Sequence, residues 1–180
     1  MKKNISILGS TGSIGLQTLE VISSFPNRFK VIGLAAKNNI NVLAEQVKKF
    51  SPKIVSVDTE STAEALQKKL GKTQTVIYFG SEGLIKVASH KDADTVVVAI
   101  PGSAGIIPTM EAIKLKKNIA LASKEVLVAA GNIIMKEAVK NGEEAYEEAS
   151  ETWLAFRDKC KEKEEEMLIK LLKLRPHLWT

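Results

Sequence analysis

Short runs of apolar, β-branched residues alternate with longer segments of helical periodicity through the first 142 residues. The runs that predict strands are 4–8, 29–36, 54–57, 75–79, 95–100 and 118–122. The segments that predict helices are 14–24, 41–50, 61–70, 83–89, 105–115 and 124–140. Strands this short and apolar are typical of a parallel sheet that helices cover on both faces. The pattern predicts an α/β, Rossmann-like domain with a doubly wound, mostly parallel sheet, which binds ligands beyond the carboxyl ends of its strands.

The pattern changes at Asn141-Gly142, a sequence that favours the end of a helix. Beyond it, apolar residues step by three and four, as the buried stripe of a helix does. The stripe consists of Tyr146, Ala149, Trp153, Phe156 and Cys160. We therefore predict two parts, a dinucleotide-binding domain over 1–142 and a helical C-terminal extension over 143–180. Such a stripe packs against protein, and a homodimer formed through it is one arrangement that stays open.

Composition and charge narrow the class of protein. No apolar run approaches the ~20 residues of a membrane span, and the N-terminus lacks the pattern of a secretion signal, so we expect a cytoplasmic protein without a membrane role. Residues 1–142 carry 19 basic and 11 acidic side chains, whereas 143–180 carry 7 and 10, which gives the net charge of +5. Because the lysines are spread over several helices with few aromatic residues among them, we expect a solvated basic surface and no nucleic-acid partner.

The strongest chemical signal directly follows the first strand. It is the glycine loop, residues 9–15, with the sequence Gly9-Ser10-Thr11-Gly12-Ser13-Ile14-Gly15. A tight turn from strand to helix favours residues without a Cβ, which Gly9 and Gly12 supply, and Gly15 lets the helix pack closely on the sheet. The N–H groups of the first helical turn then face a diphosphate, which the helix dipole attracts. The loop's serines and threonine add hydroxyl donors, and the whole segment predicts a dinucleotide-binding site.

The end of the second strand indicates which dinucleotide binds. An NAD site usually has Asp or Glu there to bind the ribose 2′-hydroxyl. This chain has Ala36-Lys37-Asn38 instead, with Lys37 22 residues after Gly15. No carboxylate repels a 2′-phosphate and the lysine attracts one, so we expect NADPH rather than NADH. The alternative is that Lys37 is a solvated loop lysine.

Two further strand ends border the same crevice. Residues 99–105 follow the fifth strand, where small residues such as Ala99 and Gly102 let the backbone approach the middle and the nicotinamide half of a cofactor. Ser123, Lys124 and Glu125 follow the sixth strand. Lys124 is a candidate for binding an anionic substrate, and Glu125 for orienting that substrate or capping the next helix.

Together these motifs resemble the 1-deoxy-D-xylulose 5-phosphate reductoisomerase family, NADPH enzymes of isoprenoid biosynthesis. The resemblance covers 1–142 and is carried by 7–15, 35–38, 50–52, 99–105 and 122–128. It implies that Thr11, Gly12, Ser13 and Ile14 contact the cofactor phosphates, with Lys37 and Asn38 near the 2′-phosphate. It also implies that Lys124 meets the sugar-phosphate substrate. Ser123 stands where the family commonly has Asn.

The chain departs from the family pattern after residue 142. The family continues with an Asp-Ser-Glu-His segment, whose carboxylates hold the catalytic Mg²⁺ or Mn²⁺, and then with a catalytic domain. This chain has no Asp-x-Glu followed by His, and the acidic run 164–166 lies on a helical pattern with its side chains in different directions. We therefore expect no metal site and no complete set of catalytic residues, so that the chain binds NADPH without turning over.

Two other functions stay open at this point. One is a small NADP-dependent dehydrogenase of another family. A short-chain dehydrogenase needs Tyr-x-x-x-Lys as its acid pair, but Tyr78 is followed by Glu82 and Tyr146 by Ser150. The other is a non-catalytic or chimeric scaffold whose helical extension mediates packing.

Overall fold

The computed structural model describes residues 2–140, which form a six-stranded sheet with every neighbouring pair of strands parallel. The strands are β1 (Lys3–Leu8), β2 (Phe29–Ala35), β3 (Ile54–Val57), β4 (Val76–Phe79), β5 (Thr95–Val98) and β6 (Asn118–Leu121). The helices are α1 (Ser13–Ser24), α2 (Ile40–Phe50), α3 (Glu60–Leu70), α4 (Gly80–Ala88), α5 (Ile106–Lys114) and α6 (Lys124–Lys140), with a 3₁₀ turn, η1 (Gly102–Gly105). The predicted α/β class and Rossmann-like fold are confirmed, and the sheet is parallel throughout.

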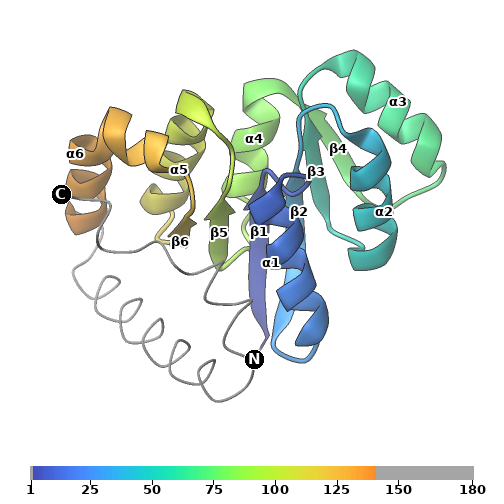
Figure 1. The fold of residues 1–180 in the computed structure, drawn as a ribbon, viewed down its shortest axis with the longest axis horizontal. Helices are drawn as coiled ribbons and strands as arrows, with labels where there is room; N and C mark the ends of the chain where they lie inside the picture. The colour runs from blue at the N-terminus through green and yellow to red at the C-terminus, as the bar shows by residue number, and fades with distance from the viewer. Residues whose placement is uncertain (1, 141–180) are drawn as a thin grey trace.

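The strands lie in the order β4-β3-β2-β1-β5-β6, which Figure 1 shows from right to left. The chain first builds outward from β1 to β4, and then crosses back to place β5 on the other side of β1. Because parallel crossovers are right-handed, this reversal moves the later helices to the opposite face of the sheet. The switch point of the doubly wound fold therefore lies between β1 and β5, where such folds bind their ligands.

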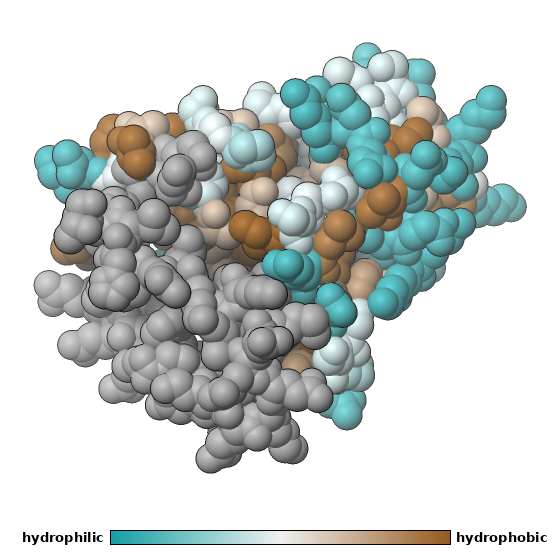
Figure 2. All heavy atoms as spheres, in the orientation of Figure 1, coloured by the Kyte–Doolittle hydropathy of each residue, from teal (hydrophilic) through white to brown (hydrophobic). Residues whose placement is uncertain are grey.

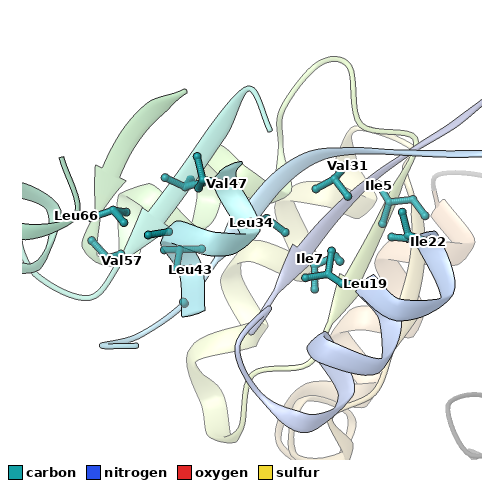
Figure 3. Packing of buried hydrophobic residues seen from close by; sticks show 13 residues of the cluster. Ile5, Ile7, Leu19, Ile22, Val31, Leu34, Leu43, Val47, Val57 and Leu66 are labelled. Carbon is teal, nitrogen blue, oxygen red and sulfur yellow. The ribbon is translucent and has the colours of Figure 1, made fainter. Parts of the chain in front are cut away.

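Each face of the sheet has its own hydrophobic core. On one face Ile5 and Ile7 of β1 meet Leu19 and Ile22 of α1, and Figure 3 shows these side chains pointing toward one another. The same cluster continues under α2 and α3, through Leu43, Val47, Val57 and Leu66. On the other face, Leu8, Val96 and Val98 pack with residues of α4, α5 and α6. Burial on both faces explains why the strands are apolar runs without a clear alternation.

On the first face, polar residues cap the N-termini of α2 and α3, and lysines lie at the C-termini of these two helices. Asn39 caps α2 by accepting a hydrogen bond from the Val42 N–H at 3.3 Å, and Thr59 caps α3 in the same way. The last turns of these helices carry Lys48, Lys49, Lys68 and Lys69. Cations are stabilised there by the negative end of the helix dipole. Figure 2 shows hydrophilic residues gathered at this end of the molecule, so the helix ends account for part of the basic surface.

Two predicted boundaries are wrong by more than one residue, and one helix that was predicted to be continuous is kinked. The fifth strand ends at Val98, two residues before the prediction, because the chain turns there to pack against the glycine loop. The fourth helix begins at Gly80 and not at residue 83, since the positive φ of +67° at Gly80 allows the helix to start directly after β4. The last helix is not continuous, because Ala130 has φ −141° and ψ 15°, values outside the helical region, and kinks α6.

The predicted C-terminal extension and the predicted lack of a membrane span concern residues that the structure describes only in part. The extension over 143–180, with Cys160 and the apolar stripe, lies outside the described residues. Within residues 2–140, no helix is both long and apolar enough to cross a membrane.

Candidate functional site

The predicted site residues meet at one edge of the sheet because the strands end in register. Leu8 at the end of β1 pairs with Ala35 of β2 and with Val98 of β5, and Val98 pairs with Leu121 of β6. The glycine loop, the Lys37 segment, residues 99–105 and the Ser123 segment each follow one of these strand ends directly. Four segments that are far apart in sequence thus lie along one carboxyl edge of the sheet, which is where a doubly wound sheet binds its ligands.

Two of the three glycines are required by close packing. Gly9 has φ +90°, and a Cβ placed on it would lie 2.5 Å from the Ala99 carbonyl oxygen. A Cβ on Gly15 would collide with the Gly9 carbonyl oxygen and with the backbone of Ser10. Since backbone cannot yield as a flexible side chain does, both positions need glycine. They bring α1 and the start of residues 99–105 tightly against the turn.

Gly12 has a different role from the one predicted. Its φ of −80° and ψ of 171° suit any residue, so the prediction that the turn itself needs glycine here is wrong. A Cβ on Gly12 would meet only the Gly9 carbonyl oxygen, at an ordinary contact distance of 3.5 Å. Gly12 is exposed and precedes α1, where it supplies no side-chain cap for the N–H groups of the first turn. The absent side chain therefore leaves space beside first-turn N–H donors that no acceptor within residues 2–140 bonds, which suits a bound diphosphate.

Hydrogen bonds to β2 and α2 hold the start of the glycine loop in place. The N–H groups of Gly9 and Ser10 both donate to the Ala35 carbonyl, at 2.9 and 2.8 Å. The Ser10 hydroxyl donates to Oε1 of Gln46 at 2.7 Å, and Nε2 of Gln46 donates back to the Ser10 carbonyl at 2.8 Å. Ser10 is fully buried, so its hydroxyl serves α2 and is not the ligand donor that the sequence predicted. Thr11 and Ser13 remain the loop's accessible hydroxyls.

Sequence reasoning missed Gln46, although the chain does carry a signal for it. Gln46 lies on the buried face of α2 together with Leu43 and Val47, and it is 6% exposed. A polar residue on the apolar stripe of a helix needs a hydrogen-bond partner in the core. That partner is a residue of the glycine loop 36 positions earlier.

The segment after β2 presents the residues expected near a 2′-phosphate. Ala36 is buried and its N–H donates to the Ser56 carbonyl, whereas Lys37 and Asn38 are exposed at the carboxyl edge of the sheet. The Asp58 N–H donates to the Lys37 carbonyl at 3.1 Å and holds the backbone in place. Within residues 2–140 no side chain pairs with the lysine, so it is an exposed cation on a fixed backbone. No acidic residue occurs between the end of β2 and the first turn of α2.

The remaining predicted residues follow β5 and β6. Ala99 donates its N–H to the Leu8 carbonyl, and Gly102 opens η1 with a φ of +73°. Ser123 is 6% exposed and lies between β6 and α6. Lys124 and Glu125 begin α6, but their side chains lie outside the described part of the structure. Their predicted contact with substrate stays a prediction.

The clearest charge cluster lies at the opposite, amino edge of the sheet. Nζ of Lys53 lies 2.6 Å from Oδ2 of Asp92, and the hydrogen bond from Lys53 lowers the pKa of that carboxyl. Burial lowers the pKa of His90 and also that of Lys117, whose ammonium donates to two backbone carbonyls. These groups stabilise the turn before β5 and are remote from the glycine loop. Among residues 2–140 no cluster of three His, Cys, Asp or Glu is suited to hold a metal.

Comparison with known proteins agrees with this geometry. The family model described as 1-deoxy-D-xylulose 5-phosphate reductoisomerase matches residues 5–131. The chain belongs to this family. Within it, the reductoisomerase 1 of Bacillus thuringiensis subsp. konkukian is 49% identical over 142 residues, which are 79% of this chain and 37% of that protein. The reductoisomerase of Geotalea daltonii is 44% identical over 86% of this chain and 40% of its own length. The chain thus spans well under half the length of these relatives.

Solved reductoisomerases share the fold. A structure of the reductoisomerase in complex with NADPH, fosmidomycin and magnesium is 38% identical, with a TM-score of 0.74 over 78% of this chain and 35% of that one. The reductoisomerase of Zymomonas mobilis in complex with NADPH is 33% identical, with a TM-score of 0.75 over 78% of this chain and 37% of that one. Both the predicted family and the predicted fold are confirmed.

Proposed function

We propose that this chain is the NADPH-binding portion of a 1-deoxy-D-xylulose 5-phosphate reductoisomerase. The observation that carries the proposal is the exposed Gly12 at the start of α1, where the missing side chain leaves a surface beside backbone N–H groups that no acceptor in the described residues bonds. Two solved reductoisomerases with matching folds were obtained with NADPH bound, which supports the same ligand here. Bound NADPH would supply the hydride for reduction of an aldehyde.

The chain's own residues would hold the two charged parts of the cofactor separately. The first-turn N–H groups of α1, with the hydroxyls of Thr11 and Ser13, would bind the diphosphate through hydrogen bonds and the helix dipole. Lys37 and Asn38 would bind the 2′-phosphate, because they are exposed at the same edge of the sheet and no acidic residue lies between the end of β2 and the first turn of α2. Residues 99–105 pack against the glycine loop and would border the middle of the cofactor.

We further propose that these 180 residues bind NADPH without turnover. The family reaction rearranges 1-deoxy-D-xylulose 5-phosphate on a divalent metal before NADPH reduces the product. The sequence contains no Asp-x-Glu followed by His to supply that metal's carboxylates. Lys124 and Glu125 would contribute to a substrate site that needs further residues. The scaffold alternative, with self-association through 143–180, concerns residues outside the described part and stays a prediction.

Titration of the full 180-residue chain with NADPH and NADH tests the proposal. We expect NADPH to bind more tightly, and Lys37→Glu to weaken NADPH about tenfold or more at low salt while weakening NADH less. Lys30→Glu is the matched control, because Lys30 is an exposed lysine at the opposite, amino end of β2. Equal affinities for the two cofactors, or equal effects of the two variants, would exclude a 2′-phosphate site at Lys37. Oxidation of NADPH on adding the sugar phosphate and Mg²⁺ would disprove the lack of turnover.

A further inference from the structure

The buried amide of Gln46 forms a closed pair of hydrogen bonds with one residue of the glycine loop. Its Nε2 donates to the Ser10 carbonyl at 2.8 Å, and its Oε1 accepts from the Ser10 hydroxyl at 2.7 Å. Both residues are buried, with 6% of Gln46 and none of Ser10 exposed. In surroundings that exclude water, such bonds are hard to replace, so they hold Ser10 in one orientation.

The orientation of Ser10 determines that of the next donor in the loop. The Ser10 carbonyl and the Thr11 N–H belong to one planar trans peptide unit, and they point in opposite directions. Because the carbonyl is directed at Gln46, the Thr11 N–H is directed away from α2. No acceptor within residues 2–140 bonds this N–H. Thr11 stands immediately before Gly12, so a free donor with a fixed direction lies beside the open surface.

We propose that Gln46 is a positioning residue for the cofactor, which aims the Thr11 N–H at the diphosphate by holding the Ser10 carbonyl. This inference rests on the proposed function and assigns no contact between Gln46 and the ligand. It also connects the two halves of the site, since α2 begins directly beyond Lys37 and Asn38. Gln46 thus links α2, the helix that follows Lys37 and Asn38, to the turn that would hold the diphosphate.

Three variants of the full chain separate positioning from ordinary core stability. Gln46→Met keeps the side-chain length but removes the donor to Ser10, and we expect the Kd for NADP⁺ to rise about tenfold at a temperature where the protein stays folded. Ser10→Ala removes the hydroxyl but keeps the bond to the carbonyl, so its effect should be smaller. Thr75→Val is the matched control, because the Thr75 hydroxyl donates to the Pro52 carbonyl in a buried bond at the far edge of the sheet. It should lower the melting temperature without changing the Kd.

Gln46→Glu provides a second test with its own readout. The ionised carboxylate repels the Ser10 carbonyl, whereas the protonated form donates to it as the glutamine amide does. The Kd of Gln46→Glu for NADP⁺, divided by the Kd of the wild type, should therefore fall toward one as the pH is lowered from 8 to 5. Titration of the ligand's own phosphates cancels in that ratio.

The outcomes distinguish this inference from the proposed function. If the wild-type chain does not bind NADP⁺ or NADPH, the proposed function fails and the role of Gln46 fails with it. If the wild type binds and Gln46→Met binds equally well with only a lower melting temperature, Gln46 is a core residue and positions nothing. If Gln46→Met does not fold, a Kd ratio for Gln46→Glu that stays constant or rises in acid overturns the inference.

Discussion

Gly12 differs from the two other glycines of the loop in what a side chain would meet. A Cβ on Gly9 or Gly15 would collide with backbone atoms of this chain, whereas one on the exposed Gly12 would make only an ordinary contact with the Gly9 carbonyl oxygen. The sequence predicted the spacing of the three glycines but not this division, because only the packed backbone shows which glycine the fold needs. It also assigned the Ser10 hydroxyl to the ligand, since a pattern of hydroxyl residues does not show which of them a neighbouring helix uses.

Replacing each glycine by alanine separates binding from folding. Gly12→Ala should change the free energy of unfolding by less than about 1 kcal/mol, since its backbone angles suit alanine and only an N-cap preference is lost. It should nevertheless weaken NADPH about tenfold or more, because the methyl group occupies the surface offered to the diphosphate. Gly15→Ala should destabilise the fold by about 2 kcal/mol or more through overpacking. Urea denaturation and NADPH titration of both variants measure this, and a matched loss of stability in Gly12→Ala would contradict it.

At the scale of elements, periodicity predicted every strand and α-helix of the described region but not the 3₁₀ turn η1, while several ends were misplaced. α1 and β3 appear within one residue of the prediction because their cores and stop signals are local, as at Pro26 after α1. β5 ends early and α6 is kinked at Ala130 because contacts between distant segments determine these features. The cluster before β5 was also missed, since Lys53 and Lys117 reach it from other elements.

The turn between α4 and β5 should make stability depend on pH. Burial lowers the pKa of His90, so the unfolded chain binds the proton more readily and stability falls as the pH drops through about 6.5. Asp92 opposes this shift, whereas Lys53, Lys117 and Lys91 add to it. Between pH 7.5 and 5.5, His90→Gln should therefore reduce the loss of stability, and Asp92→Asn should increase it. The change for His90→Gln should stay below about 1 kcal/mol per pH unit.

Urea denaturation at the two pH values measures these slopes. The lowered pKa of Asp92 acts in a separate range, because the stability it contributes is present above the ordinary carboxyl value and is lost as the pH falls through the folded value below about 4. Parallel slopes for the wild type and both variants between pH 7.5 and 5.5 would show that His90 does not couple to folding.

For the whole molecule, the sequence predicted a doubly wound sheet but not the order of its strands. That order depends on how the helices pack on the two faces, and it decides that β1 and β5 are neighbours. Their adjacency brings Gly9 against Ala99 and places the four predicted segments at one edge. The candidate site was therefore predictable as a set of residues. The pair of hydrogen bonds between Gln46 and Ser10 could be seen only in the three-dimensional structure.

The backbone amide spectrum of the ¹⁵N-labelled chain during NADPH addition tests cofactor binding at this edge most directly. The largest shifts should occur at Thr11, Gly12, Ser13, Ile14 and Gly15, with a second group at Lys37 and Asn38. The amino edge around His90 should stay unchanged. Saturable binding that leaves the amides of the glycine loop unmoved, or no binding at all, would contradict a diphosphate held at the start of α1.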